Sequence, residues 1–355
     1  MKVYETWITH IREDKPFVVY KKPNQTQVKG LFQQDSTLHL VSNFKEKGFV
    51  LAPFYEGVRF YIPLETSVEI EEDVQADQFQ LDACESENGL DYEKQPEKGQ
   101  FEDLVRRCVA AIKQGNFGKV VPSRKEVVPL QVGEIPSLFT KLLAAYPEAF
   151  CYVIYHPQVG LWMGATPETL IALEGHTLQT MALAGTQVNH GREEVYWGEK
   201  EKEEQAYVTD FIVDKLKPLS DAIQISKPFT KRAAKVMHIC TSIDAQLKQG
   251  DVKTLVEALH PTPAVCGLPK SAARDFLIRE EGYSRNYYAG YLGELNYSTP
   301  QNKLTTQLFV NLRCMEIEKS QVSIYIGCGV TAESDPTSEF IETVNKSTTM
   351  KKILF

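Results

Sequence analysis

The segment KVVPSRKE, residues 119–126, is the first of a series of motifs from which the architecture can be predicted. Alternation along a strand places Lys119, Val121 and Ser123 on one face. Lysines are rarely buried without a partner, so this pattern alone is typical of a solvated charge at a sheet edge. The alternative is a reactive amine that points into a pocket. Pro122 interrupts the pattern and predicts an edge or a bulge at that point.

The composition is typical of a folded globular protein with an acidic surface. The chain has 355 residues, 43% of them apolar, which is enough for two average domains or one large α/β domain. The net charge of -8 provides no broad basic field for nucleic acid or an anionic membrane, although it is compatible with a local basic pocket for a small anion. We therefore expect neither nucleic acid nor a membrane as a partner.

The remaining bulk features predict a cytoplasmic protein. The N-terminal residues, MKVYETWITHIREDK, carry charges where an export signal needs an unbroken apolar segment. No apolar run approaches the ~18 residues that a membrane-spanning helix requires. The seven cysteines are scattered without a CxxC pair, which argues for reduced thiols and against a zinc site.

Patterns along the chain predict sheets that are backed by helices. Short β-like runs occupy residues 17–70, and a polar loop follows at 85–98. Apolar residues at i, i+3, i+4, i+7 and i+11 from Phe101 predict a helix that ends at Gly115. Further strands are expected at 119–129, 149–156, 160–164, 168–173, 178–183, 289–297, 304–315 and 321–328, and helices at 135–146, 194–217, 251–259, 268–281 and 335–354. Because long crossovers are few, this order predicts an α+β fold with antiparallel or mixed sheets.

Two glutamates stand where an acid needs an explanation. Glu168, in GATPETL, follows a proline where a strand is expected to begin, a place where most acids are simply solvated. Glu204 ends the run EKEKEE, which normally marks a wet helix surface, yet it borders an apolar face that continues with Val208 and Phe211. A carboxylate in that position needs a cation, which can be a metal ion.

Basic residues supply a second group of candidates. Arg313, in FVNLRCME, lies inside a predicted apolar strand, where an unpaired guanidinium is costly and a bidentate carboxylate ligand would explain it. Glu342 and Lys346 form an i, i+4 pair on the last predicted helix, and such pairs usually add only about 0.2–0.5 kcal/mol to helix stability. His260, in HPTPAVCG, is expected to be structural because it lies in a rigid, proline-rich turn.

Two glycine-bearing turns are expected to border a ligand. LAGT (183–186) and YIGCGVT (325–331) place small residues at predicted strand ends, where backbone N–H groups can approach an anion closely. Neither is a GxGxxG sequence that opens a helix, so a dinucleotide site is disfavoured.

In this order, the segments resemble the chorismate-utilising enzymes, the family of isochorismate, salicylate, anthranilate and aminodeoxychorismate synthases. The resemblance runs from about Phe101 to the C-terminus, through KVVPSR, GATPE, LAGT, the acidic helix that ends at Glu204, LHPTPAVCG, YYAGYLGE, LRCMEIE, GCGVTAESDPTSE and ETVNK. It implies an α+β (α/β) fold with a single large domain of two face-packed, mainly antiparallel sheets and helices outside, as in anthranilate synthase component I. Residues 1–95 would be the β-rich N-terminal part of this domain, and residues 96–355 the chorismate-binding catalytic region.

The resemblance also implies the site. By similarity, Glu204 and Glu342 would hold Mg²⁺, which receives the ring carboxylate of chorismate. Arg313 and Lys346 would bind the carboxylate of the enolpyruvyl arm. The ligand would further be lined by Gly185, Thr186, Val265, Tyr288, Leu312 and Gly327. Gln205 follows the metal acid where the family frequently has histidine, which would alter the surroundings of the metal ligand.

Two positions distinguish the branches of this family. Ammonia-using members usually carry glutamine where this chain has Lys119, and the aminodeoxychorismate branch has a nucleophilic lysine where this chain has Ala184. Both differences imply addition of water. Lys119 would be the general base that activates water for attack at ring C2, and Glu168 the general acid that protonates the departing C4 hydroxyl. Lys119 would have to lose its proton near neutral pH, which burial near cations favours, and Glu168 would have to stay protonated.

These inferences predict an isochorismate synthase, an Mg²⁺-dependent isomerase acting in menaquinone or siderophore synthesis. HPTPAVCG is closer to the isochorismate branch than to the salicylate branch, in which pyruvate is then eliminated. The alternatives are a salicylate synthase, an enzyme like anthranilate synthase component I, and a non-catalytic chorismate-binding subunit. We expect no amidotransferase subunit as a partner, and a monomer or a weak dimer.

Overall fold

The structure is a computed structural model that describes residues 2–73, 95–130, 135–188, 195–233 and 236–355. The predicted loop at 85–98 lies outside the described residues except for its last four positions. Within the described part of the chain, no helix is long and apolar enough to cross a bilayer.

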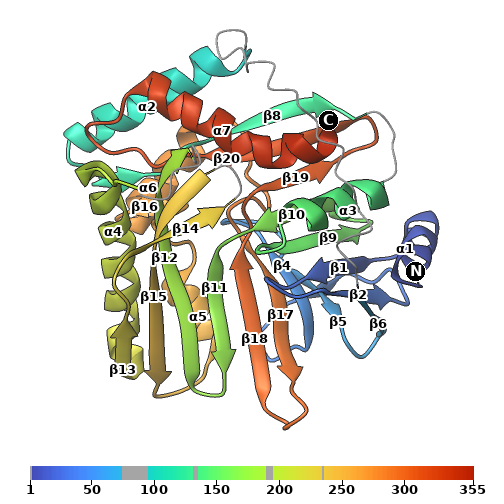
Figure 1. The fold of residues 1–355 in the computed structure, drawn as a ribbon. Helices are drawn as coiled ribbons and strands as arrows, with labels where there is room; N and C mark the ends of the chain where they lie inside the picture. The colour runs from blue at the N-terminus through green and yellow to red at the C-terminus, as the bar shows by residue number, and fades with distance from the viewer. Residues whose placement is uncertain (1, 74–94, 131–134, 189–194, 234–235) are drawn as a thin grey trace.

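Eight antiparallel strands form the first sheet, which Figure 1 shows with its strands running across the view. Their order is β6 (Ser67–Asp73), β2 (Gln27–Gln33), β1 (Phe17–Lys21), β9 (Phe150–His156), β10 (Gly160–Thr166), β19 (Cys314–Ile317), β20 (Gln321–Gly327) and β8 (Ser123–Pro129). The N-terminal strands β1 and β2 and the C-terminal strands β19 and β20 therefore belong to the same sheet. The pairing of β10 with β19 joins the two groups.

The second sheet has ten strands, which run up and down in Figure 1. Their order is β13 (Ser220–Ile225), β15 (Val236–Leu247), β12 (Thr177–Val188), β11 (Thr169–Glu174), β18 (Leu304–Val310), β17 (Tyr291–Ser298), β4 (Gly48–Ala52), β5 (Phe60–Pro63) and β3 (His39–Leu40), and β14 (Phe229–Ala233) pairs with β15. A separate pair joins β7 (Lys119–Val120) to β16 (Gly267–Leu268).

Alternation along β1 explains how the first sheet separates two cores. Val18 and Tyr20 belong to the core shared with the second sheet, where the Tyr20 ring packs 4.9 Å from that of Phe49. Phe17 and Val19 face the opposite core, which α1 (Lys2–Arg12), α3 (Ile135–Ala145) and α7 (Pro336–Leu354) cover. The prediction of two face-packed, mainly antiparallel sheets with helices outside is confirmed.

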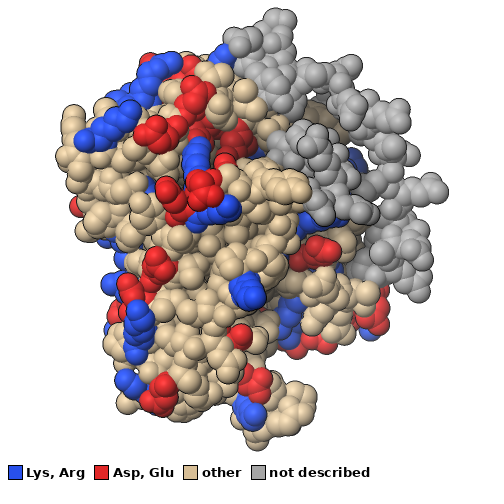
Figure 2. Space-filling model, turned by 60° about the vertical axis from the view of Figure 1, so that its left-hand side comes forward, with Lys and Arg blue, Asp and Glu red and all other residues tan. Residues whose placement is uncertain are grey.

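The other helices cover the remaining surfaces. On the described residues, α2 (Lys98–Lys113) packs on α7, and α4 (Glu199–Leu216) packs on β12 and β15. The 3-10 helix η3 (Lys217–Leu219), α5 (Val252–Leu259) and α6 (Lys270–Glu280) follow. On the face seen in Figure 2, acidic and basic side chains are interspersed without a broad field of one sign, as the net charge predicted.

Two neighbouring connections carry the chain from one sheet to the other. Residues 167–168 join β10 of the first sheet to β11 of the second, and residues 311–313 return from β18 to β19. The strand predicted at 304–315 is therefore wrong, because it is two strands in different sheets. Arg313 lies at the turn between them with φ 49, not inside an apolar strand.

Other sequence expectations also need correction. The continuous strand 119–129 is interrupted at 121–122, and β7 and β8 pair with different partners, so Pro122 does mark the predicted break. LAGT is not at a strand end: Gly185 is a bulge inside β12, with φ 71. Helix α1 and the strands between residues 220 and 247 were not predicted. For β15, the β-branched residues were a usable signal of a strand.

Candidate functional site

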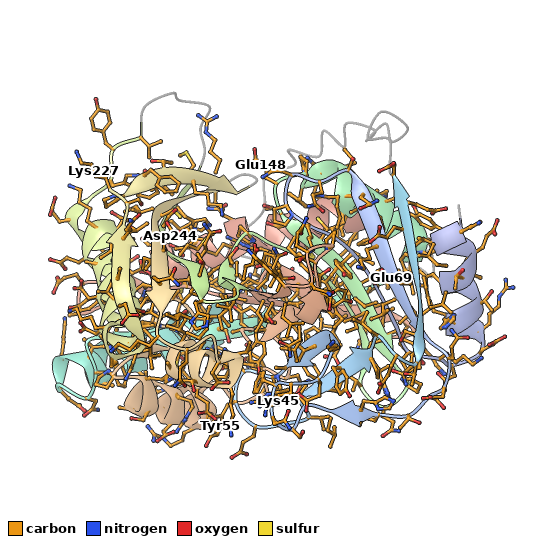
Figure 3. The ribbon with its side chains drawn as sticks, turned by 90° about the horizontal axis from the view of Figure 1, so that it is seen from below. Lys45, Tyr55, Glu69, Glu148, Lys227 and Asp244 are labelled. Atoms are coloured by element: carbon orange, nitrogen blue, oxygen red, sulfur yellow. The ribbon has the colours of Figure 1, made fainter. Side chains whose placement is uncertain are left out.

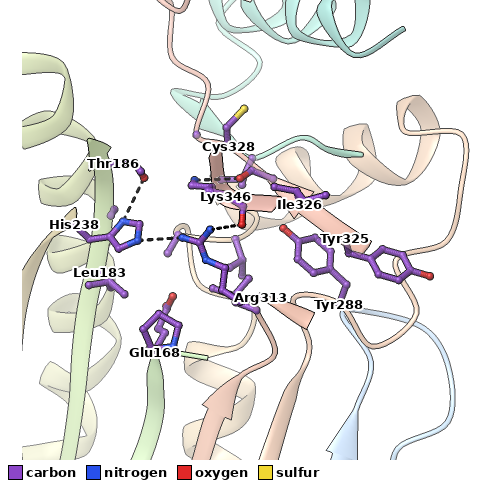
Figure 4. Close-up of a pocket in the computed structure, with 18 of the residues that line it drawn as sticks. Glu168, Leu183, Thr186, His238, Tyr288, Arg313, Tyr325, Ile326, Cys328 and Lys346 are labelled. Carbon is purple, nitrogen blue, oxygen red and sulfur yellow. Dashed lines mark hydrogen bonds between the residues drawn. The ribbon is translucent and has the colours of Figure 1, made fainter. Parts of the chain in front are cut away.

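A pocket lies where the two connections between the sheets meet. Figure 4 shows its residues converging from both sheets and from α7. Ten of the twelve predicted site residues line it: Glu168, Gly185, Thr186, Glu204, Val265, Tyr288, Leu312, Arg313, Gly327 and Lys346. Segments that are distant in the sequence therefore form one cavity.

The other two predicted residues, Lys119 and Glu342, are paired with lining residues. Lys119 has a completely buried side chain, and its Nζ lies 3.1 Å from Oε1 of Glu204. Nζ makes no hydrogen bond of good geometry within the described part of the chain, so it retains donor capacity for a ligand or water. The carboxylate of Glu342 accepts a hydrogen bond from Nζ of Lys346 at 2.6 Å. The solvated interpretation of Lys119 is excluded by this burial.

Backbone hydrogen bonds position Glu168 between the two sheets. Its carbonyl accepts a hydrogen bond from the amide of Val310 at 3.0 Å, which ties the first connection to the second. The Thr166 hydroxyl donates to the Val310 carbonyl at 2.6 Å. The Glu168 side chain is buried, and this burial raises the pKa of its carboxyl to about 8. A carboxyl in this environment is protonated at neutral pH and can donate a proton.

Arg313 enters the pocket as a part-buried cation whose contacts are neutral. One guanidinium nitrogen donates to the carbonyl of Lys346 at 3.3 Å, and another lies 3.2 Å from Nε2 of His238. Within the described part of the chain, Arg313 has no carboxylate at ion-pair distance. A guanidinium that is partly removed from water and has no carboxylate partner is costly, so this arrangement favours an anionic ligand.

His238, on β15, is a site residue that was not predicted from the sequence. The bulge at Gly185 brings that carbonyl to 3.0 Å from Nδ1, and the Thr186 hydroxyl lies 3.3 Å from the same nitrogen. Burial, and then Arg313, hold the pKa of His238 well below its usual value, so the ring is neutral. Nδ1–H must therefore donate to the Gly185 carbonyl, which leaves Nε2 to accept from Arg313. A histidine in the β-branched run VMHICTSI was the signal that could have identified it.

The Gly327 carbonyl and the helix α7 hold Lys346. Its Nζ donates to the Gly327 carbonyl at 3.1 Å in addition to its contact with Glu342. A Cβ on Gly327 would lie 2.9 Å from the Tyr288 hydroxyl and 3.0 Å from the Pro122 carbonyl, so glycine is needed for this close approach. The predicted role of the YIGCGVT turn in bordering the pocket therefore has a steric basis.

Gly329 is a further position that sequence reasoning did not identify. A Cβ there would lie 2.1 Å from Oε1 of Glu204, a contact that no real side chain makes. The absence of a side chain at Gly329 thus creates the space that the Glu204 carboxylate occupies. The signal was present in GCGVT, but only the second glycine of that motif faces α4.

A buried ion pair connects the Lys119 segment to the pocket wall. Glu281 and Arg285 pair with almost no exposed side-chain surface. Arg285 donates to the carbonyl of Val121 at 2.6 Å and to that of Val265 at 2.8 Å. Glu281 accepts from the amide of Ser123 at 2.7 Å. Because the break at Pro122 removes strand pairing, these bonds hold that segment in place.

Carboxylates on two helices provide candidate ligands for a hard divalent cation. Glu204 on α4 and Glu342 on α7 both lie near Lys346, and burial alone would raise the pKa of Glu204, but Lys119 and Lys346 outweigh it and keep the pKa below its ordinary value. The described residues contain no group of three acidic, histidine or cysteine side chains at metal spacing. The Glu204 carboxylate lines the pocket and that of Glu342 accepts from the lining residue Lys346, and such oxygen ligands fit Mg²⁺, which commonly binds one or two carboxylates and retains water.

His260 has the structural role that its turn predicted. It is half-buried, its Nε2 lies 3.1 Å from the carbonyl of Phe54, and its ring contacts Tyr291. Burial, and then Lys270, lower the pKa of His260 to about 3, so it remains neutral. It does not line the pocket.

Comparisons with known proteins identify relatives of this chain. The family model described as "chorismate binding enzyme" matches residues 63–355. The salicylate biosynthesis isochorismate synthase of Pseudomonas aeruginosa is 33% identical over 268 residues, which cover 73% of this chain and 55% of that protein. The isochorismate synthase MenF of Escherichia coli is 28% identical over 273 residues, which cover 73% of this chain and 61% of MenF. The alignments thus span less than two thirds of each relative.

Solved structures share the fold. The structure of Escherichia coli MenF superposes with a TM-score of 0.76 at 21% identity, covering 96% of this chain and 89% of that chain. Anthranilate synthase component I of Streptococcus pneumoniae superposes with a TM-score of 0.67 at 16% identity, covering 94% of this chain and 92% of that chain. At these identities, the superpositions establish a shared fold, that is, the same arrangement of the two sheets.

Proposed function

Since this chain belongs to the chorismate binding enzyme family, we propose that it is an isochorismate synthase, an isomerase that converts chorismate to isochorismate. The observation that carries this proposal is one pocket in which a buried Glu168 lies among cationic groups from several elements, α7 among them. The relatives named as isochorismate synthases support the same reaction class.

The charges of the pocket suit a substrate with two carboxylates. Arg313 has part-buried, forked donors that can bind a carboxylate in a bidentate manner, and Lys346 lies beside it. The stacked rings of Tyr288 and Tyr325, 5.7 Å apart, provide an apolar wall for a ring. In the proposed complex, Arg313 and Lys346 bind the carboxylate of the enolpyruvyl arm.

The proposed reaction exchanges one hydroxyl for another. Lys119 removes a proton from water as the water oxygen bonds to C2 of the ring. The ring double bonds shift, the C4–O bond breaks, and Glu168 gives its proton to the leaving hydroxyl, so that water is released. Both proton transfers occur in a buried site, where a positioned acid or base typically contributes 10²- to 10⁴-fold (about 3–5 kcal/mol) to the rate.

We further propose that Mg²⁺ is the cofactor, held by Glu204 and Glu342. When bound, it would neutralise the ring carboxylate of chorismate. Glu204 is also the ion-pair partner of Lys119, so ligation of Glu204 would leave that amine without its counter-charge.

Water is proposed over ammonia because of two residues. Lys119 stands where ammonia-using family members usually have glutamine, and Ala184 stands where the aminodeoxychorismate branch has a nucleophilic lysine. Ala184 is buried in β12 next to the Gly185 bulge, so it presents no nucleophile to the pocket.

Product analysis tests this function. The protein is incubated with chorismate and Mg²⁺, without ammonia, and the products are separated by chromatography. Isochorismate as the sole product is expected. Salicylate with pyruvate would assign the chain to the salicylate branch, whereas unchanged chorismate would favour a non-catalytic binding subunit. A parallel incubation with an ammonium salt tests the anthranilate alternative, for which anthranilate or aminodeoxychorismate would be the product.

A further inference from the structure

Lys231 contacts the connection that carries Glu168, although it comes from a peripheral strand. It lies on β14, which is outside the main order of the second sheet and pairs with β15. Its Nζ donates a hydrogen bond to the carbonyl of Pro167 at 2.9 Å and lies 3.5 Å from Sδ of Met181 on β12. The ammonium is thus at the peptide unit that precedes Glu168.

Cations from four elements surround the buried carboxyl of Glu168. They are Lys231 on β14, Lys119 on β7, Arg313 at the turn before β19 and Lys346 on α7, and the neutral groups nearby are Cys240 and His238 on β15. Burial raises the pKa of Glu168 most, and of the four cations Lys231 opposes this increase most strongly. The pKa of a carboxyl in these surroundings therefore depends on each of the positive charges.

Lys231 differs from the two other lysines of this group in its partners. Lys119 is paired with Glu204, and Lys346 with Glu342. Within the described residues, Lys231 contacts a carbonyl and a thioether but no carboxylate. It borders a second cavity of about 240 Å³, for which Pro167 and Arg313 also provide walls. Its positive charge is therefore available to act on Glu168, while water in the second cavity can solvate it.

We propose that Lys231 is a positioning residue for Glu168. Its ammonium holds the connection between β10 and β11 through the Pro167 carbonyl, and its charge limits how strongly the neighbouring Glu168 carboxyl retains its proton. This inference rests on the proposed role of Glu168 as the general acid. An acid that kept its proton too firmly would transfer it poorly to the leaving hydroxyl, since catalysis favours a proton affinity near the working pH. Lys231 would lower the proton affinity of Glu168 in this way without contacting the substrate.

The test compares Lys231→Gln, which removes the charge, with Lys231→Arg, which preserves it. Lys227→Gln is the control with the same change in net charge, because Lys227 is exposed at the rim of the molecule (Figure 3). The pH dependence of kcat/KM for chorismate is measured for each protein, with Glu168→Gln as the reference. A second measurement, independent of turnover, follows the carboxyl band of Glu168 by infrared difference spectroscopy of the ligand-free protein.

We expect the basic limb of the rate profile and the infrared titration of Lys231→Gln to move upward by about one pH unit. The rate profiles and infrared titrations of Lys231→Arg and Lys227→Gln should coincide with those of the wild type. The inference is overturned if Lys231→Gln shifts neither the rate profile nor the infrared titration. It is also overturned if Lys231→Arg shifts both as much as Lys231→Gln does, because the side chain then acts through packing and not through its charge. A wild-type profile without a limb that depends on Glu168 would instead reject the proposed acid, and this inference with it.

Discussion

Nζ of Lys119 and Oε1 of Glu204 lie 3.1 Å apart in a buried contact between β7 and α4. The proposed base and a proposed metal ligand are therefore each other's partner. This relationship couples the two functions, because a change at either residue alters the charge that the other faces.

Lys119→Ala is expected to reduce turnover by roughly 10²- to 10⁴-fold, the range for loss of a positioned base. Steady-state kinetics with chorismate measure it. Lys125→Ala, which removes an exposed lysine from β8, is the matched control and should retain normal turnover. Near-normal turnover of Lys119→Ala would remove Lys119 from the mechanism.

A double-mutant cycle on the free energy of unfolding tests the coupling itself. Glu204→Gln alone should be destabilising by about 3–5 kcal/mol, because it leaves the buried Lys119 ammonium uncompensated. Combination with Lys119→Met should recover a large part of this loss, and urea unfolding measures all four proteins. Strictly additive effects would show that the two side chains do not interact in solution.

The raised pKa of Glu168, about 8, predicts how stability changes with pH. Between the ordinary carboxyl pKa and 8, the folded protein holds a proton that the unfolded chain has released. Stability contributed by this group is therefore complete at low pH and is lost as pH rises through 8. Relative to Glu168→Gln, the wild type should lose up to about 1.4 kcal/mol per pH unit in this window. Parallel unfolding free energies of the two proteins between pH 5.5 and about 7.5 would contradict the assignment.

Removal of a proposed metal ligand should weaken Mg²⁺ binding without unfolding the protein. Glu342→Gln is expected to lower Mg²⁺ affinity by at least about tenfold, or 1.4 kcal/mol. Isothermal titration of the ligand-free protein measures this, and chelation of the metal should abolish turnover of the wild type. Glu318→Gln, at an exposed acid, is the control. An unchanged titration for Glu342→Gln would reassign this acid to its ion pair with Lys346.

Gly329→Ala should separate metal binding from folding. The new Cβ would be 2.1 Å from Oε1 of Glu204, so the carboxylate must move away. Since that carboxylate is the end of a flexible side chain, we expect a near-normal melting temperature but lost Mg²⁺ affinity. Gly99→Ala adds a Cβ with no atom within 4 Å and serves as the control. Normal Mg²⁺ binding by Gly329→Ala would show that Glu204 needs no fixed position.

Arg285→Met should damage stability and the site together. It leaves Glu281 as an uncompensated buried charge, which typically costs about 3–5 kcal/mol, and releases the carbonyls of Val121 and Val265. Denaturant unfolding and the KM for chorismate measure the two effects. Arg279→Met removes an exposed guanidinium from the nearby helix α6 and should change neither. A destabilised variant with an unaltered KM would limit Arg285 to a structural role.

Much of the fold was predictable because the deciding signals are local. Periodicity located α2, α4 and α7, and alternation located most strands of the two sheets. The strand predicted at 304–315 failed for a physical reason: an apolar run is equally compatible with one strand and with two that lie in different sheets. Only the pairing partners of β18 and β19 reveal that the chain changes sheets before Arg313.

For the candidate site too, some features could be predicted from the sequence and others depend on the tertiary structure. The sequence by itself determined which reactive side chains are available, and ordered motifs such as GATPE and ETVNK placed Glu168, Glu342 and Lys346 among them. The tertiary structure alone decided that Lys119 is buried against Glu204, that His238 meets Arg313, and that Gly329 leaves room for a carboxylate. Such contacts join residues far apart in the chain, as His238 and Arg313 are, which are 75 positions apart. Local patterns carry propensity and polarity, whereas these juxtapositions arise from the packing of two sheets and their helices.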